Sequence, residues 1–145
     1  MMDKTVPAPI PDGFVKHVSD DPFEDINGLV YINDMGEGRV EVGLLADERH
    51  ANEYGAVHGA VMMMMADAAL CMNSRWHDPN EGAITVSANN DFVAGAQIGE
   101  FLETRSSIVR RTGSFSFMRC DVVVGERVVM TSSGIIKRLL PKSDG

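Results

Sequence analysis

The chain is poor in cysteine. Its 145 residues include only Cys71 and Cys120, and neither belongs to a CxxC pair or to a cluster of cysteine and histidine. This spacing gives no support for a zinc site, so no metal is expected. Isolated thiols within apolar stretches are typical of free, buried cysteines in a reducing cytoplasm.

Long apolar runs and an excess of basic residues are also missing. Residues 1–13 contain no apolar signal-peptide core, and the longest apolar run, 60–72, is interrupted by Asp67 and is too short for a bilayer. The 13 basic and 21 acidic residues give a formal net charge of -8, which disfavours nucleic acid and anionic membranes as partners. We therefore expect a cytoplasmic protein, in which a local cluster of cations can still bind an anionic ligand.

The composition fits one globular domain. Apolar residues make up 44% and charged residues 23% of the chain, which are ordinary values for a folded protein. No repeat, low-complexity segment or linker divides the sequence. We expect an extended or disordered arm over 1–18, a single domain over 19–139 and a loose tail over 140–145.

The hydrophobic pattern predicts two helices and six strands. A short helix is expected over 19–26, and a long one over about 57–76, where alanine, methionine and leucine dominate. Period-two alternation and turn residues predict strands over 28–33, 39–45, 83–93, 100–110, 114–124 and 127–137. Short connections predict that the last four strands form an antiparallel meander.

The long helix carries four consecutive methionines, Met62 to Met65, which place apolar groups on every side. A helix of this kind is expected to be buried all round. In a chain of this size only a large sheet that curls around the helix can bury it, which predicts an α+β architecture. The methionines are expected in the core and at a subunit interface, or alternatively along a flexible apolar pocket.

Asp67 lies in the middle of this helix, between Ala66 and Ala68. Aspartate is a poor residue for a helix interior and is rarely buried without a partner. The pattern therefore indicates either a catalytic carboxylate or a carboxylate that a hydroxyl or an arginine satisfies structurally.

His58 and Gly59 stand at the predicted start of the helix, where free backbone N–H groups face an incoming anion. Glycine lets a substrate approach closely, so the Gly59 N–H is a candidate donor to a carbonyl oxyanion. His58 is alternatively only a helix cap. Because eight residues separate Gly59 from Asp67, they lie about 12 Å apart along the helix. Both can serve one carbonyl carbon only if they come from two different chains.

The segment from Asn52 to Ala60, followed by Met65-Ala66-Asp67, resembles the signature of the phenylacetate-pathway (PaaI-like) hotdog thioesterases. That signature is an Asn, a Gly, a His-Gly-Gly turn and a Leu-Ala-Asp step into the helix. Asn52 stands six residues before His58, and Asp67 nine residues after it, as in the family. The chain departs from the pattern where Ala60 replaces the second glycine and where Met65 replaces the leucine. Neither change removes a reactive group.

The resemblance, which extends over residues 27–139, implies a hotdog fold, a homodimer or a dimer of dimers (a homotetramer), and hydrolysis of an acyl-CoA thioester. It implies no cofactor beyond the coenzyme A carried by the substrate. Asp67 would act as nucleophile or general base, and the Gly59 N–H of the other chain would polarise the carbonyl. The remaining implied site residues are His58, which orients the turn, Asn52, near the thioester or water, and Thr85, which holds the attacking water.

The phosphates of coenzyme A require cations. Arg110 and Arg111, with Lys137 and Arg138, form the best basic cluster of the sequence, although these positions also suit ordinary solvated strand ends. Two other hotdog functions stay open: a dehydratase or hydratase, and a module that binds acyl-CoA without catalysis. The residues do not distinguish an aromatic acyl group from a fatty one.

Overall fold

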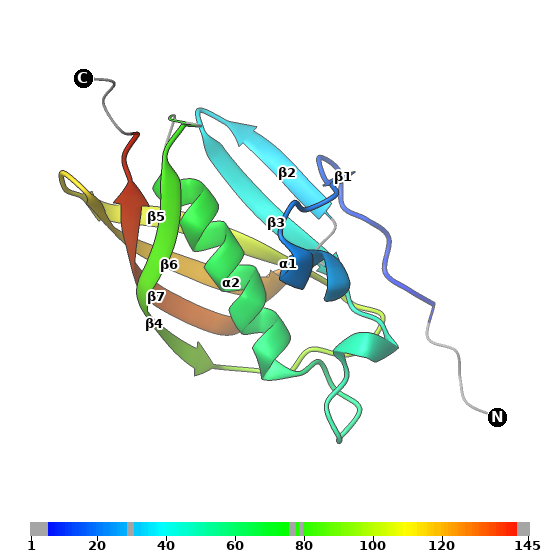
Figure 1. Cartoon of the computed structure of the whole chain (residues 1–145). Coiled ribbons are helices and arrows are strands. Elements are labelled where there is room, and N and C mark those ends of the chain that lie inside the picture. The colour runs from blue at the N-terminus through cyan, green and yellow to red at the C-terminus, as the bar shows by residue number, and fades with distance from the viewer. Residues whose placement is uncertain (1–5, 29–30, 76–77, 79, 142–145) are drawn as a thin grey trace.

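A computed structural model describes residues 6–28, 31–75, 78 and 80–141. The described residues form two helices, a 3-10 turn and seven strands, and one long helix lies against the sheet (Figure 1). In chain order the elements are β1 (Val15–Lys16), α1 (Pro22–Ile26), β2 (Tyr31–Gly36), β3 (Arg39–Leu45), η1 (Glu48–His50), α2 (Gly59–Ser74), β4 (Gly82–Phe92), β5 (Phe101–Arg111), β6 (Phe115–Val124) and β7 (Arg127–Leu139).

The strands form a single antiparallel sheet in the order β1-β2-β3-β5-β6-β7-β4. The predicted hairpins β2–β3 and β6–β7 are present, and the first turns through Glu37 and Gly38, both at positive φ. The predicted meander of the last four strands is wrong, because β4 pairs with β7 and not with β5. The connection over residues 93–100 is too long for a tight hairpin, so β4 can lie at the far edge of the sheet.

Helix α2 matches the predicted long helix, beginning two residues later than expected and ending at Ser74. The prediction for Trp76 falls outside the described residues. The core face of α2 packs against the curved sheet and includes Met62, Met64, Met65 and Leu70, all buried. The aliphatic and methionine side chains of this face therefore form the centre of the protein, together with the inner faces of β3 and β5–β7.

The expectation that α2 is buried all round is wrong for a single chain. One stripe of the helix, made of Ala60, Met63 and Asp67, stays exposed, and 44% of the Met63 surface is accessible. These positions are three and four residues apart, so they share one face of the helix. The sheet covers only one side of a helix, and the remaining stripe is left for solvent or for another chain.

The N-terminal arm packs against the sheet in its described part. Phe14 is buried and makes an edge-to-face contact with Phe101, at 5.1 Å between ring centroids. The two residues of β1 extend the sheet by pairing with β2, and residues 17–21 then lead into α1 beside α2. Among the described residues, no helix is both long and apolar enough to cross a membrane.

Candidate active site

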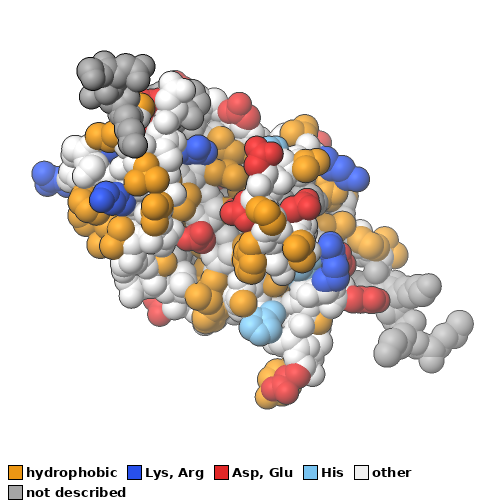
Figure 2. All heavy atoms as spheres, in the orientation of Figure 1, with side chains coloured by type: hydrophobic (Ala, Val, Ile, Leu, Met, Phe, Trp, Pro, Cys, Tyr) orange, Lys and Arg blue, Asp and Glu red, His pale blue; other side chains and the backbone are white. Residues whose placement is uncertain are grey.

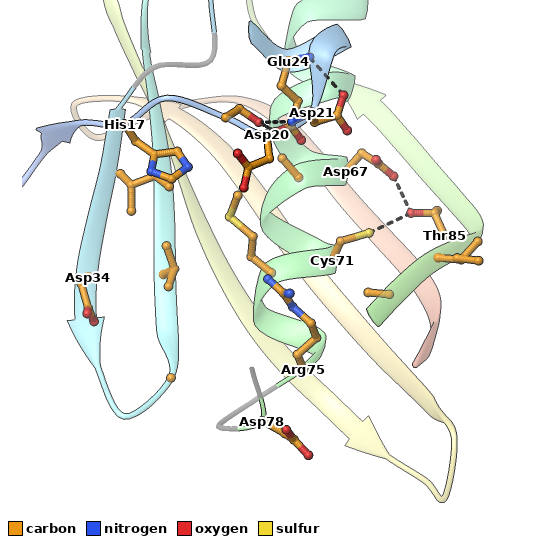
Figure 3. Close-up of a pocket in the computed structure, with 18 residues that line it drawn as sticks. His17, Asp20, Asp21, Glu24, Asp34, Asp67, Cys71, Arg75, Asp78 and Thr85 are labelled. Carbon is orange, nitrogen blue, oxygen red and sulfur yellow. Dashed lines mark hydrogen bonds between the residues drawn. The ribbon is translucent and has the colours of Figure 1, made fainter. Parts of the chain in front are cut away.

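Asp67 points away from the core and into an open cavity, where it meets the edge strand. The Thr85 hydroxyl donates a hydrogen bond of 2.5 Å to Oδ1 of Asp67 (Figure 3). Thr85 pairs with the buried Ile136 across β4 and β7, which turns its side chain toward α2. A register shift between Thr85 and Ser87 follows immediately. The family resemblance implied that both residues belong to the site, and the structure brings their side chains into direct contact.

The cavity has a volume of about 1150 Å³ and an apolar floor with an acidic rim. Ile32, Val40, Ala68, Met72 and Ala83 form the apolar part of its lining. The rim carries more carboxylates than cations, and acidic side chains spread across the middle of this face in the space-filling view (Figure 2). Besides His17, the lining contains the charged residues Asp20, Asp21, Glu24, Asp34, Asp67, Arg75 and Asp78.

The start of α2 lies at the other end of the helix from this cavity. His58 is the N-cap residue, and its Nδ1 accepts the Ala60 N–H at 2.9 Å. In the neutral imidazole the proton therefore resides on Nε2, which is left free to donate. The Val61 N–H is bonded to the His58 carbonyl. Within the described chain the Gly59 N–H has no acceptor, so it remains available as a donor.

Gly59 has a steric reason to be glycine. A Cβ at this position would lie 2.8 Å from Cε1 of Phe92, which is closer than carbon atoms pack. The Phe92 ring thus covers the flank of the helix start. Asn52 supports the preceding loop, because its Oδ1 accepts the N–H groups of Tyr54 and Ala56 at 2.9 and 3.1 Å. Its side-chain oxygen holds the loop, and only its amide N–H groups are left to contact a ligand.

The four basic residues predicted to bind coenzyme A are divided between the two faces of the sheet. Arg138 is buried, with 4% of its side chain accessible, and its Nη1 donates to Glu81 at 3.0 Å. Arg111 reaches the same carboxylate at 3.1 Å. Arg110 and Lys137 are exposed on the outer face, because they pair with Phe117 and Phe115, whose side chains point outward. The cluster is therefore not one site, and Arg138 holds the fold together.

Strand β4 forms one edge of the sheet, and no described strand pairs with its outer side. It is eleven residues long and carries large apolar side chains that are more than half exposed, with accessible fractions of 53% for Ile84, 57% for Val86 and 55% for Phe92. Long apolar edges of this kind pair readily with another strand. Thr85 belongs to this edge strand, and its side chain contacts Asp67.

Cys71 is the site residue that the sequence reasoning missed. Its Sγ lies 3.3 Å from the Thr85 hydroxyl, and it lines the same cavity as Asp67. Burial raises the pKa of the Cys71 thiol; the Thr85 contact opposes this effect, and the Asp67 charge adds to it. The signal was present in the sequence, because Cys71 stands one helical turn after Asp67 and shares its face. Cys120, by contrast, is a buried core thiol whose pKa is raised to about 12 by burial.

His50 is buried, with Nδ1 accepting the Asp47 N–H at 2.9 Å and Nε2 lying 2.7 Å from the Asn27 carbonyl. Its own carbonyl accepts the His58 N–H, so His50 supports the loop that leads to the helix start. Within the part of the chain that the structure describes, no three His, Cys, Asp or Glu residues are grouped to hold a metal ion.

Comparison with known proteins identifies the architecture. The family model of the thioesterase superfamily matches residues 54–131, which is more than half of the chain. A protein of Pseudomonas aeruginosa that carries the provisional name of an esterase is 27% identical over 127 residues, 87% of this chain and 95% of that protein.

Two solved structures resemble the chain over most of its length. A variant of the phenylacetic acid degradation protein PaaI from Thermus thermophilus has a TM-score of 0.73 at 25% identity, covering 82% of this chain and 100% of that one. A hypothetical thioesterase from Streptococcus pneumoniae, solved with coenzyme A, has a TM-score of 0.69 at 18% identity, covering 77% and 90%. The predicted hotdog fold, and the resemblance on which it rested, are confirmed.

Proposed function

Because the chain belongs to the thioesterase superfamily, we propose that it hydrolyses an acyl-CoA thioester to a free acid and coenzyme A, with Asp67 as the reactive carboxylate. The observation that carries this proposal is the Asp67–Thr85 hydrogen bond of 2.5 Å at an open cavity. Thr85 fixes Oδ1 of the carboxylate, so Oδ2 is left to face a water molecule or the thioester carbon.

In the reaction Asp67 either removes a proton from an attacking water or attacks the thioester carbon itself. In the first case the water oxygen bonds to the acyl carbon, and the proton taken by Asp67 passes to the departing sulfur. In the second case the Asp67 carboxylate bonds to the acyl carbon as the C–S bond breaks, which forms an acyl anhydride and releases coenzyme A as a thiolate. Water then cleaves the anhydride to the free acid and the Asp67 carboxylate, and the remaining proton of that water goes to the thiolate. Both routes place negative charge on the carbonyl oxygen, and both need a hydrogen-bond donor at that atom.

The Gly59 N–H, without an acceptor in the described chain, is that donor in our proposal. Because Gly59 lies about 12 Å along α2 from Asp67 of the same chain, it must come from a second copy. His58 presents Nε2–H and Asn52 presents its amide N–H groups at the same end of the helix. Each site thus combines Asp67, Thr85 and Cys71 of one chain with the helix start of another.

The free edge of β4 and the exposed stripe of α2 support this dimer. Pairing two copies of β4 would cover the apolar side chains of Ile84 and Val86 and continue the sheet from one chain into the next. It would also bring the uncovered stripes of two α2 helices together. Further pairing of dimers is part of the proposal, and the exposed Val109, Phe115 and Phe117 of the outer sheet face offer an apolar surface for it.

The substrate assignment rests on the family and on the cavity. The Streptococcus pneumoniae structure of the same fold contains coenzyme A, which supports coenzyme A as the carrier here. Arg110 and Lys137 are the exposed members of the predicted basic cluster, and they are our candidates for contacts to its phosphates. The apolar floor of the cavity suits an uncharged acyl chain or ring.

The test is thioester hydrolysis by the purified protein, followed with a thiol reagent across aryl and fatty acyl-CoAs. We expect turnover by the wild type and a loss of about 10²–10⁴-fold in kcat for Asp67→Asn, which keeps the size of the side chain and removes its charge. Asp78→Asn is the matched control, because Asp78 lines the same cavity without contacting Thr85. Full activity of Asp67→Asn would exclude the mechanism. A folded wild type that binds acyl-CoA without hydrolysing it would indicate a binding module.

A further inference from the structure

A row of three side chains links the two elements of the site: Cys71 on α2, Thr85 on β4 and Asp67 on α2 (Figure 3). The Thr85 hydroxyl has only one proton, and an ionised carboxylate can only accept a hydrogen bond. The proton of Thr85 must therefore point to Asp67, at 2.5 Å. The remaining contact, 3.3 Å between Thr85 Oγ1 and Cys71 Sγ, can be a hydrogen bond only if the thiol donates.

We propose that Cys71 is a positioning residue of the thioesterase site, whose S–H donates to Thr85 Oγ1 and so directs the Thr85 proton onto Asp67. This inference rests on the proposed function of Asp67. Cys71 would not attack the substrate, since a raised pKa keeps its thiol protonated. Because the Cys71 thiol stays protonated, it can donate a hydrogen bond to Thr85.

The geometry explains why a donor is useful at this position. A hydroxyl rotates freely about its C–O bond, and Thr85 lies at the rim of an open cavity where water can compete for its proton. A donor at a second contact of Oγ1 disfavours the orientation in which the Thr85 proton points toward Cys71. The carboxylate of Asp67 is then held at one oxygen before the substrate arrives, which is the preorganisation that catalysis requires.

A residue that acts through Thr85 is expected to affect kcat and not KM, because it does not contact the substrate. We expect Cys71→Ala to lower kcat about 3- to 10-fold, the range of one weak hydrogen bond, while KM changes less than about twofold. Cys71→Ser keeps a donor one helical turn from Asp67 and should retain kcat within about twofold of the wild type.

The decisive experiment is a double-mutant cycle with Thr85→Val, which keeps the branched shape and removes the hydroxyl. In the Thr85→Val background, Cys71→Ala should change kcat by less than about 1.5-fold, because the residue through which it acts is gone. Cys120→Ala serves as a control for the loss of a thiol elsewhere, and thermal melting of every variant checks folding.

The outcomes separate this inference from the proposed function. If the wild type hydrolyses acyl-CoA and Asp67→Asn does not, while Cys71→Ala costs the same factor in both backgrounds, the positioning role is overturned and the thioesterase assignment stands. Equal losses in Cys71→Ala and Cys71→Ser would overturn it as well, since a packing role would explain them. A folded wild type with no hydrolysis would overturn both.

Discussion

Replacing Arg138 by methionine should destabilise the protein strongly, although the sequence first suggested a role in ligand binding. In the structure its guanidinium donates to both carboxylate oxygens of Glu81, at 3.0 and 3.3 Å, and to the carbonyls of Thr112 and Gly113, the latter at 2.8 Å. The side chains of Arg138 and Glu81 are only 4% and 6% accessible. Arg138→Met retains the apolar stem and removes every one of these bonds.

The expected loss of stability follows from the buried groups that Arg138→Met leaves without partners. Glu81 keeps one partner, Arg111 at 3.1 Å, and otherwise becomes a buried charge without compensation, which typically costs about 3–5 kcal/mol. The buried Nε of Arg138 has no acceptor in the described chain, and its removal recovers part of that cost. We therefore expect the lower end, about 3 kcal/mol, or a fall of roughly 10 °C in melting temperature for a chain of this length.

Thermal and urea unfolding measure the effect directly. Lys137→Met is the matched control, because the adjacent Lys137 is exposed and should change stability by less than about 0.5 kcal/mol. Adding Glu81→Gln to Arg138→Met should restore part of the loss by removing the uncompensated charge. If Arg138→Met melted within about 2 °C of the wild type, the argument that the buried ion pair supports the fold would be refuted.

Three further predictions concern the assembly, the substrate and the pH dependence. Val86→Lys, on the free edge of β4, should convert the dimer to a monomer, measured by light scattering, and the monomer should be inactive. Val109→Lys, on the outer face, should leave a dimer. An active Val86→Lys monomer would contradict the two-chain site. The acidic rim should repel the carboxylate of a succinyl group, so kcat/KM should be at least about 10-fold higher for butyryl-CoA than for succinyl-CoA. Asp20→Asn should reduce this ratio. Equal values of kcat/KM for the two substrates would contradict this role of the rim. The pKa of Cys120 is raised to about 12 in the folded protein, so the unfolded chain loses this proton first as pH rises, and stability should fall by roughly 1–2 kcal/mol between pH 9 and 10.5. Cys120→Ala should show a shallower alkaline fall in urea titrations, and an unchanged slope would contradict the assignment.

Much of the fold could be predicted because its helices and strands follow short-range patterns in the sequence. The alternation of Val40, Val42 and Leu44 predicted β3, and the run of alanine and methionine predicted α2 to within two residues at each end. The Asn52, His58 and Asp67 spacing indicated the family, which the comparison confirmed. These signals depend only on neighbouring residues, which the sequence contains directly.

Other features required the tertiary structure. The long connection over residues 93–100 argued against a β4–β5 hairpin, but the local pattern did not indicate that β4 pairs with β7, because strand pairing depends on contacts far apart in the chain. That placement forms the free edge, and it puts Thr85 beside Asp67 and Cys71. The basic cluster is divided because adjacent residues of a strand, such as Lys137 and Arg138, point to opposite faces of the sheet, and the packing of the sheet decides which of the two faces is buried.

The sequence by itself therefore determined the type of fold, the long helix and the candidate carboxylate. Only the tertiary structure decided which stripe of that helix stays uncovered, which cation is buried and which thiol meets Thr85. The physical reason is that helix and strand formation follow local periodicity, whereas burial and side-chain contacts depend on which distant segments pack together.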